Sequence, residues 1–259
     1  MSALLTVNAL AKTYINRRGL LRKEAVQAVQ DLSFELEAGQ TLAIVGETGS
    51  GKTTVAKLLT GAERPSSGQI SLEGQVVDSH TEGKACQWIR MIFQDPSTSL
   101  NPRVTIGRQL EEPLKINTEL GGAERWALVE ATLRRVGLLS EHADYYPHMI
   151  SGGQKQRVAL ARALILGPRI LVLDEAVSAL DVSIRSQILN LLLEEQKRND
   201  LAYVLVSHNM GIVKHISDYV LVMDHGQVVE RGPTAQVFAN PSHEVTRRML
   251  YAQNLLGKS

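Results

Sequence analysis

The most constraining feature of the sequence is the glycine-rich segment GETGSGKT at residues 46–53, which matches the pattern G-x-x-x-x-G-K-S/T. It directly follows a short apolar run at residues 41–45, which is typical of a strand buried on both faces. It also opens a stretch at residues 52–60 that has a helical pattern, with Gly61 placed to end the helix. A strand, a glycine turn and a helix in this order predict a phosphate-binding loop, because the turn amides and the positive helix end both attract anionic oxygens.

The residues of this segment have distinct expected roles in holding a nucleotide. The glycines let the backbone curl so that successive N–H groups face the β- and γ-phosphate oxygens, and Lys52 adds a positive charge between those phosphates. Thr53 offers a hydroxyl to Mg²⁺, which keeps most of its octahedral shell as water and phosphate oxygens. The expected nucleotide-binding residues here are Gly46, Glu47, Thr48, Gly49, Ser50, Gly51, Lys52, Thr53 and Thr54.

Two further apolar runs end in residues that suit phosphate chemistry. Residues 170–173 are followed directly by Asp174 and Glu175, and residues 203–206 are followed closely by His208. Open α/β sheets bind ligands at this end of their strands, so we expect Asp174 to be a metal partner and Glu175 to orient and deprotonate an attacking water. The alternative for the carboxylates is a helix cap. His208 is a candidate donor to the γ-phosphate or the water, with a purely structural hydrogen bond as the alternative.

Patterning along the rest of the chain predicts an α/β sheet domain that carries a helical insertion. Residues 124–136 and 154–166 have helical patterns, and both lie between the first and second of the strand-like runs. Residues 219–223 and 227–230 flank Asp-His-Gly at residues 224–226, which is typical of a hairpin turn. We find no repeat or long linker that would separate two independent domains.

The composition argues against several classes of protein. The 259 residues can form a sizeable core, and 28 Lys and Arg against 27 Asp and Glu give a net charge of +1, so no nucleic-acid partner is expected. A single cysteine, Cys86, cannot form an internal disulfide. The apolar runs are far shorter than the ~20 residues needed to cross a bilayer, so we expect that the chain does not span a membrane by itself.

The segment ISGGQ at residues 150–154 distinguishes this chain from other phosphate-loop proteins, and with it the chain resembles the ATPases of ABC transporters. The resemblance covers about residues 5–250 and rests on seven motifs in the order typical of that family. The motifs are KTY with Tyr14, GETGSGKTT at 46–54, IFQDP with Gln94, SGGQ at 151–154, ILVLDE at 170–175, SALD ending at Asp181, and VLVSH with His208.

This resemblance implies the fold class and its division along the chain. The fold would be α/β, with a P-loop NTPase (RecA-like) core, an antiparallel β subdomain and an inserted α-helical subdomain. Residues 1–94 and 167–240 would form the core with the antiparallel subdomain. Residues 95–166 would form the helical subdomain, and residues 241–259 a short C-terminal tail.

The resemblance also implies roles for residues whose position alone leaves alternatives open. Tyr14 would stack on adenine, although a packing role is equally consistent with its position. Gln94 would sense Mg²⁺ and the attacking water, although it could be a strand-end amide capped by backbone. The residues that would bind a nucleotide held by the opposite subunit of a dimer are Ser151, Gly152, Gly153 and Gln154, and Asp181 is also expected to bind nucleotide. On spacing alone, Ser151 and Gln154 also form an ordinary helix capping box.

Within the family, the segments at residues 90–103, 145–181 and 237–250 are similar to the peptide/nickel importer branch. This implies an ATP-hydrolysing subunit, with ATP and Mg²⁺ as cofactors, at the cytoplasmic face of a bacterial inner membrane. Its cargo would be peptides, including antimicrobial peptides, with dipeptides, nickel or polyamines as alternative cargoes. A soluble ATPase without a transport role remains an alternative function. The implied direct partners are a sister ATPase subunit or a second copy of the chain, and two permeases. The permeases would dock near residues 97–102, and a periplasmic solute-binding protein would be an indirect partner.

Overall fold

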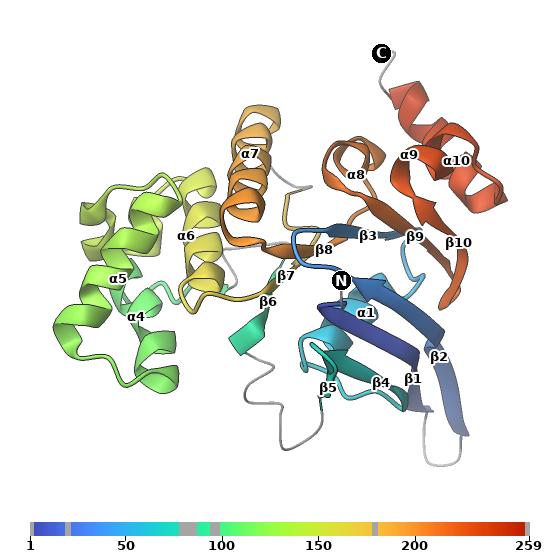
Figure 1. Ribbon diagram of the computed structural model, residues 1–259, viewed down its shortest axis with the longest axis horizontal. Helices are drawn as coiled ribbons and strands as arrows, with labels where there is room; N and C mark the ends of the chain where they lie inside the picture. Colours follow the sequence, from blue (N-terminus) through green and yellow to red (C-terminus); the bar gives the residue numbers. More distant parts are fainter. Residues whose placement is uncertain (1–2, 19–21, 78–86, 94–98, 178–180, 257–259) are drawn as a thin grey trace.

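The computed structural model describes residues 3–18, 22–77, 87–93, 99–177 and 181–256. A mostly parallel six-stranded sheet lies beside a four-stranded antiparallel sheet, with helices around the larger sheet (Figure 1). The strands are β1 (Leu5–Arg18), β2 (Arg22–Leu36), β3 (Thr41–Gly46), β4 (Ser67–Leu72), β5 (Gln75–Val76), β6 (Ile89–Ile92), β7 (Ile170–Asp174), β8 (Ala202–Val206), β9 (Tyr219–Asp224) and β10 (Gln227–Pro233). The helices are α1 (Lys52–Leu59), α4 (Ile106–Asn117), α5 (Gly122–Arg135), α6 (Gly152–Leu164), α7 (Val182–Asn199), α8 (Met210–Ile216), α9 (Thr234–Ala239) and α10 (Glu244–Leu256), with short 3₁₀ turns η1 (Ser140–Asp144) and η2 (Pro147–Met149).

The larger sheet has the strand order β10-β9-β3-β8-β7-β6. Strands β6, β7, β8, β3 and β9 are parallel, and β10 pairs antiparallel with β9. β3, which precedes the glycine loop, therefore lies between β8 and β9, with β7 one strand further away. Because parallel strands share one carboxyl edge, the glycine loop and the residues after β7 and β8 meet at the same edge.

Both faces of the parallel sheet are buried, which explains why its strands are continuous apolar runs. Along β3, Ala43 and Val45 belong to one hydrophobic cluster, and Leu42 and Ile44 to a second. The first cluster includes the inserted helices and α7. The second includes α1 and the antiparallel sheet of order β2-β1-β4-β5.

The helices α4, α5 and α6 gather at one end of the molecule, at the left of Figure 1. Leu110, Leu133 and Val158 belong to the same hydrophobic cluster as one face of the large sheet, so the inserted helices share a continuous core with it. An ion pair adds to this contact: the Arg135 guanidinium on α5 binds the Glu195 carboxylate on α7, whose side chain is 1% exposed. The hydrogen bond to Glu195 raises the pKa of Arg135 above its ordinary value.

At the other end of the molecule, α8, α9 and α10 lie together, at the upper right of Figure 1. The C-terminal residues 244–256 thus form a helix of 13 residues that packs on α8. Among the described residues, no helix combines the length and the apolar character that crossing a bilayer requires.

Candidate nucleotide-binding site

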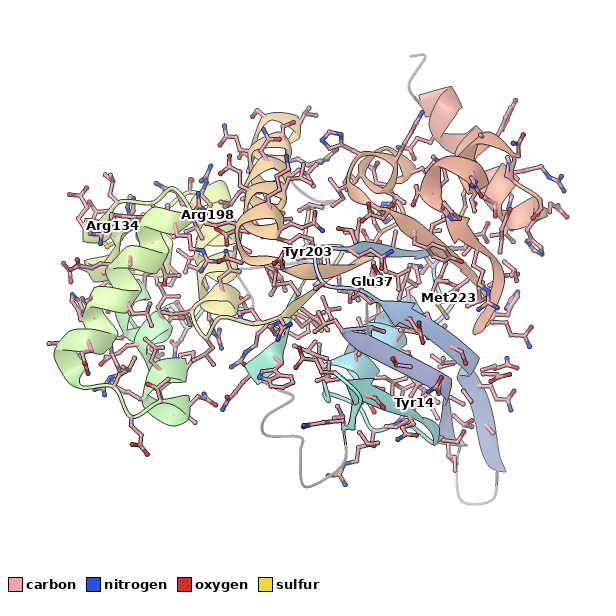
Figure 2. The ribbon with its side chains drawn as sticks, in the orientation of Figure 1. Tyr14, Glu37, Arg134, Arg198, Tyr203 and Met223 are labelled. Atoms are coloured by element: carbon pink, nitrogen blue, oxygen red, sulfur yellow. The ribbon has the colours of Figure 1, made fainter. Side chains whose placement is uncertain are left out.

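The loop between β3 and α1 depends on glycines in backbone conformations that other residues rarely adopt. Gly46, Gly49 and Gly51 have φ angles of 155°, 86° and 105°. A Cβ on Gly46 would lie 2.3 Å from the carbonyl oxygen of Met223 (labelled in Figure 2), and one on Gly51 would lie 2.1 Å from that of Ala28. A Cβ on Gly49 would meet no described atom within 4 Å. Gly46 and Gly51 are therefore needed for the loop to pack against β9 and β2, whereas Gly49 faces open space.

Lys52, the first residue of α1, folds back over the loop. Its Nζ donates hydrogen bonds to the carbonyl oxygens of Gly46 at 2.9 Å and Glu47 at 2.7 Å, and lies 3.4 Å from the Ser50 hydroxyl. Burial lowers the pKa of Lys52, and the largest opposing influence is the carboxylate of Glu175. An ammonium group held only by neutral oxygens can exchange them for phosphate oxygens, with which it forms stronger charge-assisted hydrogen bonds.

Thr53 on α1 and Asp174 at the end of β7 bring two side-chain oxygens close together. The Thr53 hydroxyl lies 3.4 Å from Oδ1 of Asp174, the last residue of β7. Burial raises the pKa of Asp174, and the hydrogen bond from Thr53 partly opposes this effect. A buried carboxylate whose ionised form is disfavoured gains stability from a nearby cation, and hydroxyl and carboxylate oxygens are ligands that Mg²⁺ prefers. The residues present therefore fit a magnesium ion held beside the phosphates.

Glu175 and His208 meet at the carboxyl ends of β7 and β8. Nδ1 of His208 lies 2.7 Å from Oε1 of Glu175, while Oε2 of Glu175 is buried and has no hydrogen-bond partner among the described residues. Glu175 has a left-handed φ of 54°. The first described helix after it begins only at Val182, with Asp181 as its N-cap residue, so the carboxylates Asp174 and Glu175 do not cap that helix. A carboxylate oxygen without a hydrogen-bond partner is suited to accept a proton from a water that reaches it.

The residues at the start of α6 contact one another and α7. Ser151 and Gln154 form the capping box: Gln154 N donates to Ser151 Oγ at 3.3 Å, and Ser151 N donates to Gln154 Oε1 at 2.9 Å. A Cβ on Gly153 would lie 3.0 Å from Ile184 Cδ1, so packing against α7 explains this glycine. A Cβ on Gly152 would meet no described atom within 4 Å. Ser151 and Gly152 are both exposed, and neither lines a cavity beside the glycine loop.

Two cavities adjoin the glycine loop on different sides. One, of 570 Å³, is lined by the loop and by β2, and its residues include Val26, Gln27, Gly49, Lys52, Thr53, Thr54 and His225. The other, of 1100 Å³, is lined by the loop, the start of α8 and α10, and its residues include Gly46, Glu47, Thr48, His208, Asn209, Arg248 and Gln253. Of the residues expected to bind a nucleotide at positions 46–54, five line the smaller cavity and three line the larger one.

Tyr14, expected to stack on adenine, lines neither of these cavities. It lies on the antiparallel sheet, as labelled in Figure 2, paired in register with Val26, and Val26 does line the smaller cavity. The Lys12 ammonium lies 5.0 Å from the centre of the Tyr14 ring. Gln94, expected at the metal, lies outside the described residues.

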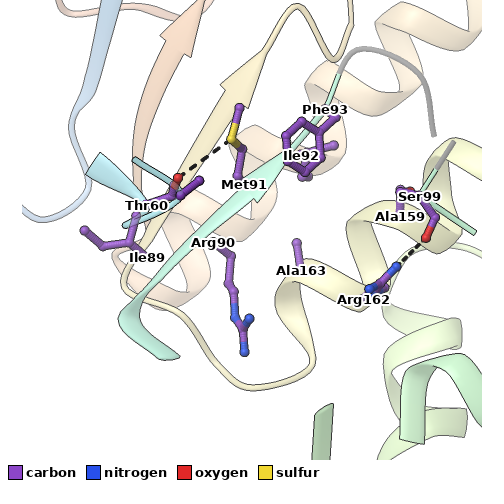
Figure 3. A pocket seen from close by; sticks show the side chains of 11 residues that line it. Thr60, Ile89, Arg90, Met91, Ile92, Phe93, Ser99, Ala159, Arg162 and Ala163 are labelled. Carbon is purple, nitrogen blue, oxygen red and sulfur yellow. Dashed lines mark hydrogen bonds between the residues drawn. The ribbon is translucent and has the colours of Figure 1, made fainter. Parts of the chain in front are cut away.

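A third cavity, of 420 Å³, lies at the edge of the large sheet between β6 and α6 (Figure 3). At its rim, Phe93 is 48% exposed, although it directly follows β6. Arg162 reaches out from α6 and donates to the carbonyl oxygen of Ser99, the contact marked by a dashed line in Figure 3. This groove adjoins the segment expected to receive a permease, residues 97–102, of which 97 and 98 lie outside the described ranges.

Residues 29–178 match the family model described as ABC transporter. The chain belongs to this family. The ABC ATPase fold expected from the sequence motifs is thereby confirmed, and the chain is an ATP-binding subunit that hydrolyses ATP to energise a transporter.

Its relatives in the ABC transporter family include two SapF proteins, each 50% identical over 96% of this chain and 93% of the relative. The protein of Escherichia coli strain K12 is named a putrescine export system ATP-binding protein, and that of Salmonella typhimurium a peptide transport system ATP-binding protein. Among solved structures, CbiO1 of Clostridium perfringens, part of the complex CbiONQ, superposes with a TM-score of 0.80 at 29% identity over 99% of this chain and all of its own. A dimeric cassette named MJ0796, bound to ADP and phosphate, superposes with a TM-score of 0.77 at 25% identity over 89% of this chain and 98% of its own.

The residues that sequence reasoning missed come from segments distant from the motifs. Val26 and Gln27 lie on β2, and His225 lies in the turn between β9 and β10 with a left-handed φ of 44°. The Asp-His-Gly sequence at residues 224–226 predicts the turn, but no local signal indicates that the turn reaches the glycine loop. The contact is nevertheless direct, since Gly226 N donates to the carbonyl oxygen of Ser50 at 3.0 Å.

Proposed function

We propose that this chain hydrolyses MgATP at the cytoplasmic face of a bacterial inner membrane to drive the transport of peptides. The observation that carries the proposal is the convergence of Lys52, Asp174, Glu175 and His208 at one edge of the sheet. The peptide cargo is supported by the printed name of the Salmonella typhimurium relative. A second candidate cargo, putrescine or another polyamine, is favoured by the name of the equally similar Escherichia coli protein.

In this proposal the chain's own groups divide the work of hydrolysis. The amides of the glycine loop and Lys52 hold the triphosphate, and Thr53, Asp174 and Gln94 would hold Mg²⁺, which would neutralise phosphate charge. Glu175 accepts a proton from the attacking water at Oε2, its oxygen without a partner among the described residues. His208 contacts the other oxygen of that carboxylate through Nδ1 and donates toward the γ-phosphate through Nε2 when both ring nitrogens are protonated. Tyr14 stacks on the adenine by analogy with the family, without a supporting contact to the smaller cavity.

We further propose that the complete site is shared between two subunits, either two copies of this chain or this chain and a sister ATPase. Ser151 and Gly152 are exposed at the tip of α6, and Asp181 is exposed at the start of α7. Gly152 in particular has open space where a side chain would be, which leaves room for a close approach. The dimeric structural relative bound to ADP and phosphate supports this assembly.

The groove between β6 and α6 is our candidate site for the permeases. It lies where the proposed core, residues 1–94 and 167–240, meets the proposed helical subdomain, residues 95–166. The exposed Phe93 offers an apolar contact to an inserted segment of a permease. Two permeases and, indirectly, a periplasmic solute-binding protein would complete the transporter, with residues 241–259 as the C-terminal part of this subunit.

The proposed hydrolysis is tested by replacing Glu175 with glutamine. The E175Q chain should lose about 10²-fold to 10⁴-fold in steady-state turnover while retaining ATP binding, because only the proton acceptor is removed. It should also accumulate as an ATP-bound dimer in size-exclusion chromatography. E194Q, the same substitution at an exposed position of α7, is the matched control. Unchanged turnover in E175Q would refute the assigned role.

The cargo is tested separately, in vesicles that contain this chain with candidate permeases and a candidate sister subunit. Peptide-stimulated ATP hydrolysis that putrescine does not reproduce would support the peptide assignment. Stimulation by putrescine from the side of this subunit would support polyamine export instead and overturn the peptide assignment.

A further inference from the structure

The C-terminal helix α10 lines a cavity together with the glycine loop and the residues that follow β8. Arg248, Met249, Ala252 and Gln253 on one side of this helix line the 1100 Å³ cavity, opposite the glycine loop and His208. The helix is held at its start by Glu230 of β10, which accepts hydrogen bonds from Ser242, His243 and Thr246. α10 is therefore fixed to the sheet at one end and reaches the candidate site with its later turns.

Gln253 makes the closest of these contacts. Its Oε1 accepts a hydrogen bond from the backbone N–H of Met210 at 2.6 Å, and its Nε2 donates to Oδ1 of Asn209 at 2.9 Å. One side-chain amide thus binds both residues that follow His208. The fit is close, since a Cβ on Gly211 would lie 3.2 Å from both Asn209 Oδ1 and Gln253 Nε2.

Asn209 makes two further hydrogen bonds besides the one from Gln253. Its Oδ1 also accepts a hydrogen bond from Ile212 N at 3.1 Å and so caps α8, and its own N–H donates to Ser207 Oγ at 3.0 Å. His208 therefore projects from a segment whose flanking residues are both hydrogen-bonded. The imidazole itself is 67% exposed, so it is this backbone that holds it against Glu175.

A second contact ties α10 to the glycine loop itself. Nε of Arg248 donates to Oε1 of Glu47 at 2.8 Å, and Nη2 lies 2.8 Å from the same oxygen. Both side chains are about half exposed, so this pair contributes little to stability by itself. Its position shows that one face of α10 spans the cavity from the loop to the segment that carries His208.

We propose that α10 is a positioning element of the ATPase site and that Gln253 is the positioning residue for His208. The inference rests on the proposed hydrolytic role of Glu175 and His208. Gln253 does not touch the nucleotide or the reacting water; it fixes the backbone that aims the His208 imidazole. Removing its amide leaves Met210 N–H without this acceptor and Asn209 without this donor, and the imidazole gains freedom to leave Glu175.

The test compares Gln253→Leu and Gln253→Glu with the unchanged chain in steady-state ATP hydrolysis. Gln253→Leu removes both hydrogen bonds at nearly constant volume and should lower kcat about fivefold, with KM and the equilibrium Kd for ATP unchanged. Gln253→Glu keeps the acceptor for Met210 N–H and should give an intermediate kcat. Tyr251→Leu, at a 66% exposed position of α10, is the matched control and should match the unchanged chain.

A double-mutant cycle separates positioning from a general loss of stability. In a His208→Ala background, Gln253→Leu should produce no further fall in kcat, because the residue it positions is already absent. An equal fall in both backgrounds, or a fall in kcat accompanied by weaker ATP binding and a lower Tm, would overturn the proposal. So would an unchanged kcat in Gln253→Leu. If Lys52→Ala retained wild-type ATP binding, the proposed function itself would fail, whatever Gln253 does.

Discussion

Nδ1 of His208 lies 2.7 Å from Oε1 of Glu175, which joins side chains from the ends of two neighbouring parallel strands. The backbone supports the same meeting, since Glu175 N donates to the carbonyl oxygen of Val206 at 3.0 Å. The second oxygen of Glu175 is buried and has no hydrogen-bond partner among the described residues. The imidazole therefore holds one carboxylate oxygen, and the other is left for a water that enters the site.

His208→Ala should lower ATP turnover about 100-fold while leaving ATP affinity nearly unchanged. The variant loses a hydrogen-bond donor to the negative charge that develops in the transition state, while the glycine loop that binds ATP is unchanged. Steady-state hydrolysis and equilibrium nucleotide binding measure the two effects separately. The control is His215→Ala, at an exposed position of α8. Equal turnover in His208→Ala and the unchanged chain would show that the pair with Glu175 is only structural.

Lys52→Ala should instead weaken ATP binding, by about 10-fold to 100-fold, because the ammonium group is the charged donor at the centre of the loop. Calorimetric titration with ATP measures this loss directly. Lys214→Ala, which removes an exposed ammonium group from α8, should bind ATP like the unchanged chain. Wild-type affinity in Lys52→Ala would contradict the phosphate assignment.

The strands of the parallel sheet could be predicted from the sequence because both of their faces are buried. The apolar runs 41–45, 170–173 and 203–206 match β3 (Thr41–Gly46), β7 (Ile170–Asp174) and β8 (Ala202–Val206). The predicted helix at 154–166 begins earlier, at Gly152, because Ser151 caps it.

The antiparallel sheet could not be derived from periodicity. β1 pairs with β2 through register shifts between Val7 and Thr13, so the simple alternation of polar and apolar residues is interrupted. The helix α10 was not predicted either, since residues 241–259 were expected to form only a short C-terminal tail. Its few buried residues are explained by its position over α8 at the surface.

In the candidate site, residues within short sequence motifs could also be predicted, whereas contacts between distant segments could not. Lys52, Thr53 and Asp174 belong to short motifs next to strands, so spacing predicts them and the sheet brings them together. Gln253 reaches Asn209 across 44 residues of sequence. That contact depends on how α10 packs, which no local pattern contains.

Complementation between two inactive variants tests whether the site is shared by two copies of this chain. Ser151→Arg should block the tip of α6, and Lys52→Ala should disable the glycine loop, so each variant alone should be inactive. In a mixed dimer, the intact loop of one variant faces the intact tip of the other. The mixture should recover roughly a quarter of the wild-type rate, since half of random dimers are mixed and each has one intact site. A mixture that stays inactive would contradict a site shared between identical chains, and Ser151→Arg with full activity would contradict a shared site altogether.

Glu230 makes the anchoring of α10 dependent on pH. Burial alone would raise the pKa of Glu230, but hydrogen bonds from Thr246, Ser242 and His243 outweigh this effect and lower the pKa from its ordinary value of 4.5 to about 2. Because the pKa is lowered in the folded state, the ionised carboxylate stabilises the folded chain fully above pH 4.5. This contribution is lost as the pH falls from 4.5 toward 2.

Glu230→Gln should therefore lower the free energy of unfolding at pH 7 by about 1 kcal/mol, a value reduced by the partial exposure of the carboxylate to solvent. In the variant, the glutamine NH₂ group would face the N–H and O–H groups of Ser242, His243 and Thr246, which donate hydrogen bonds to the carboxylate in the unchanged chain. Urea unfolding at pH 7 and near pH 3.5 should show that the difference from the unchanged chain becomes smaller in acid, because near pH 3.5 the unfolded chain, with the ordinary pKa of 4.5, binds a proton at Glu230 that the folded chain does not. Glu73→Gln, which breaks an exposed ion pair with Arg169, should show little difference at either pH. A difference for Glu230→Gln that is constant over this range would show that the charge of Glu230 does not anchor α10.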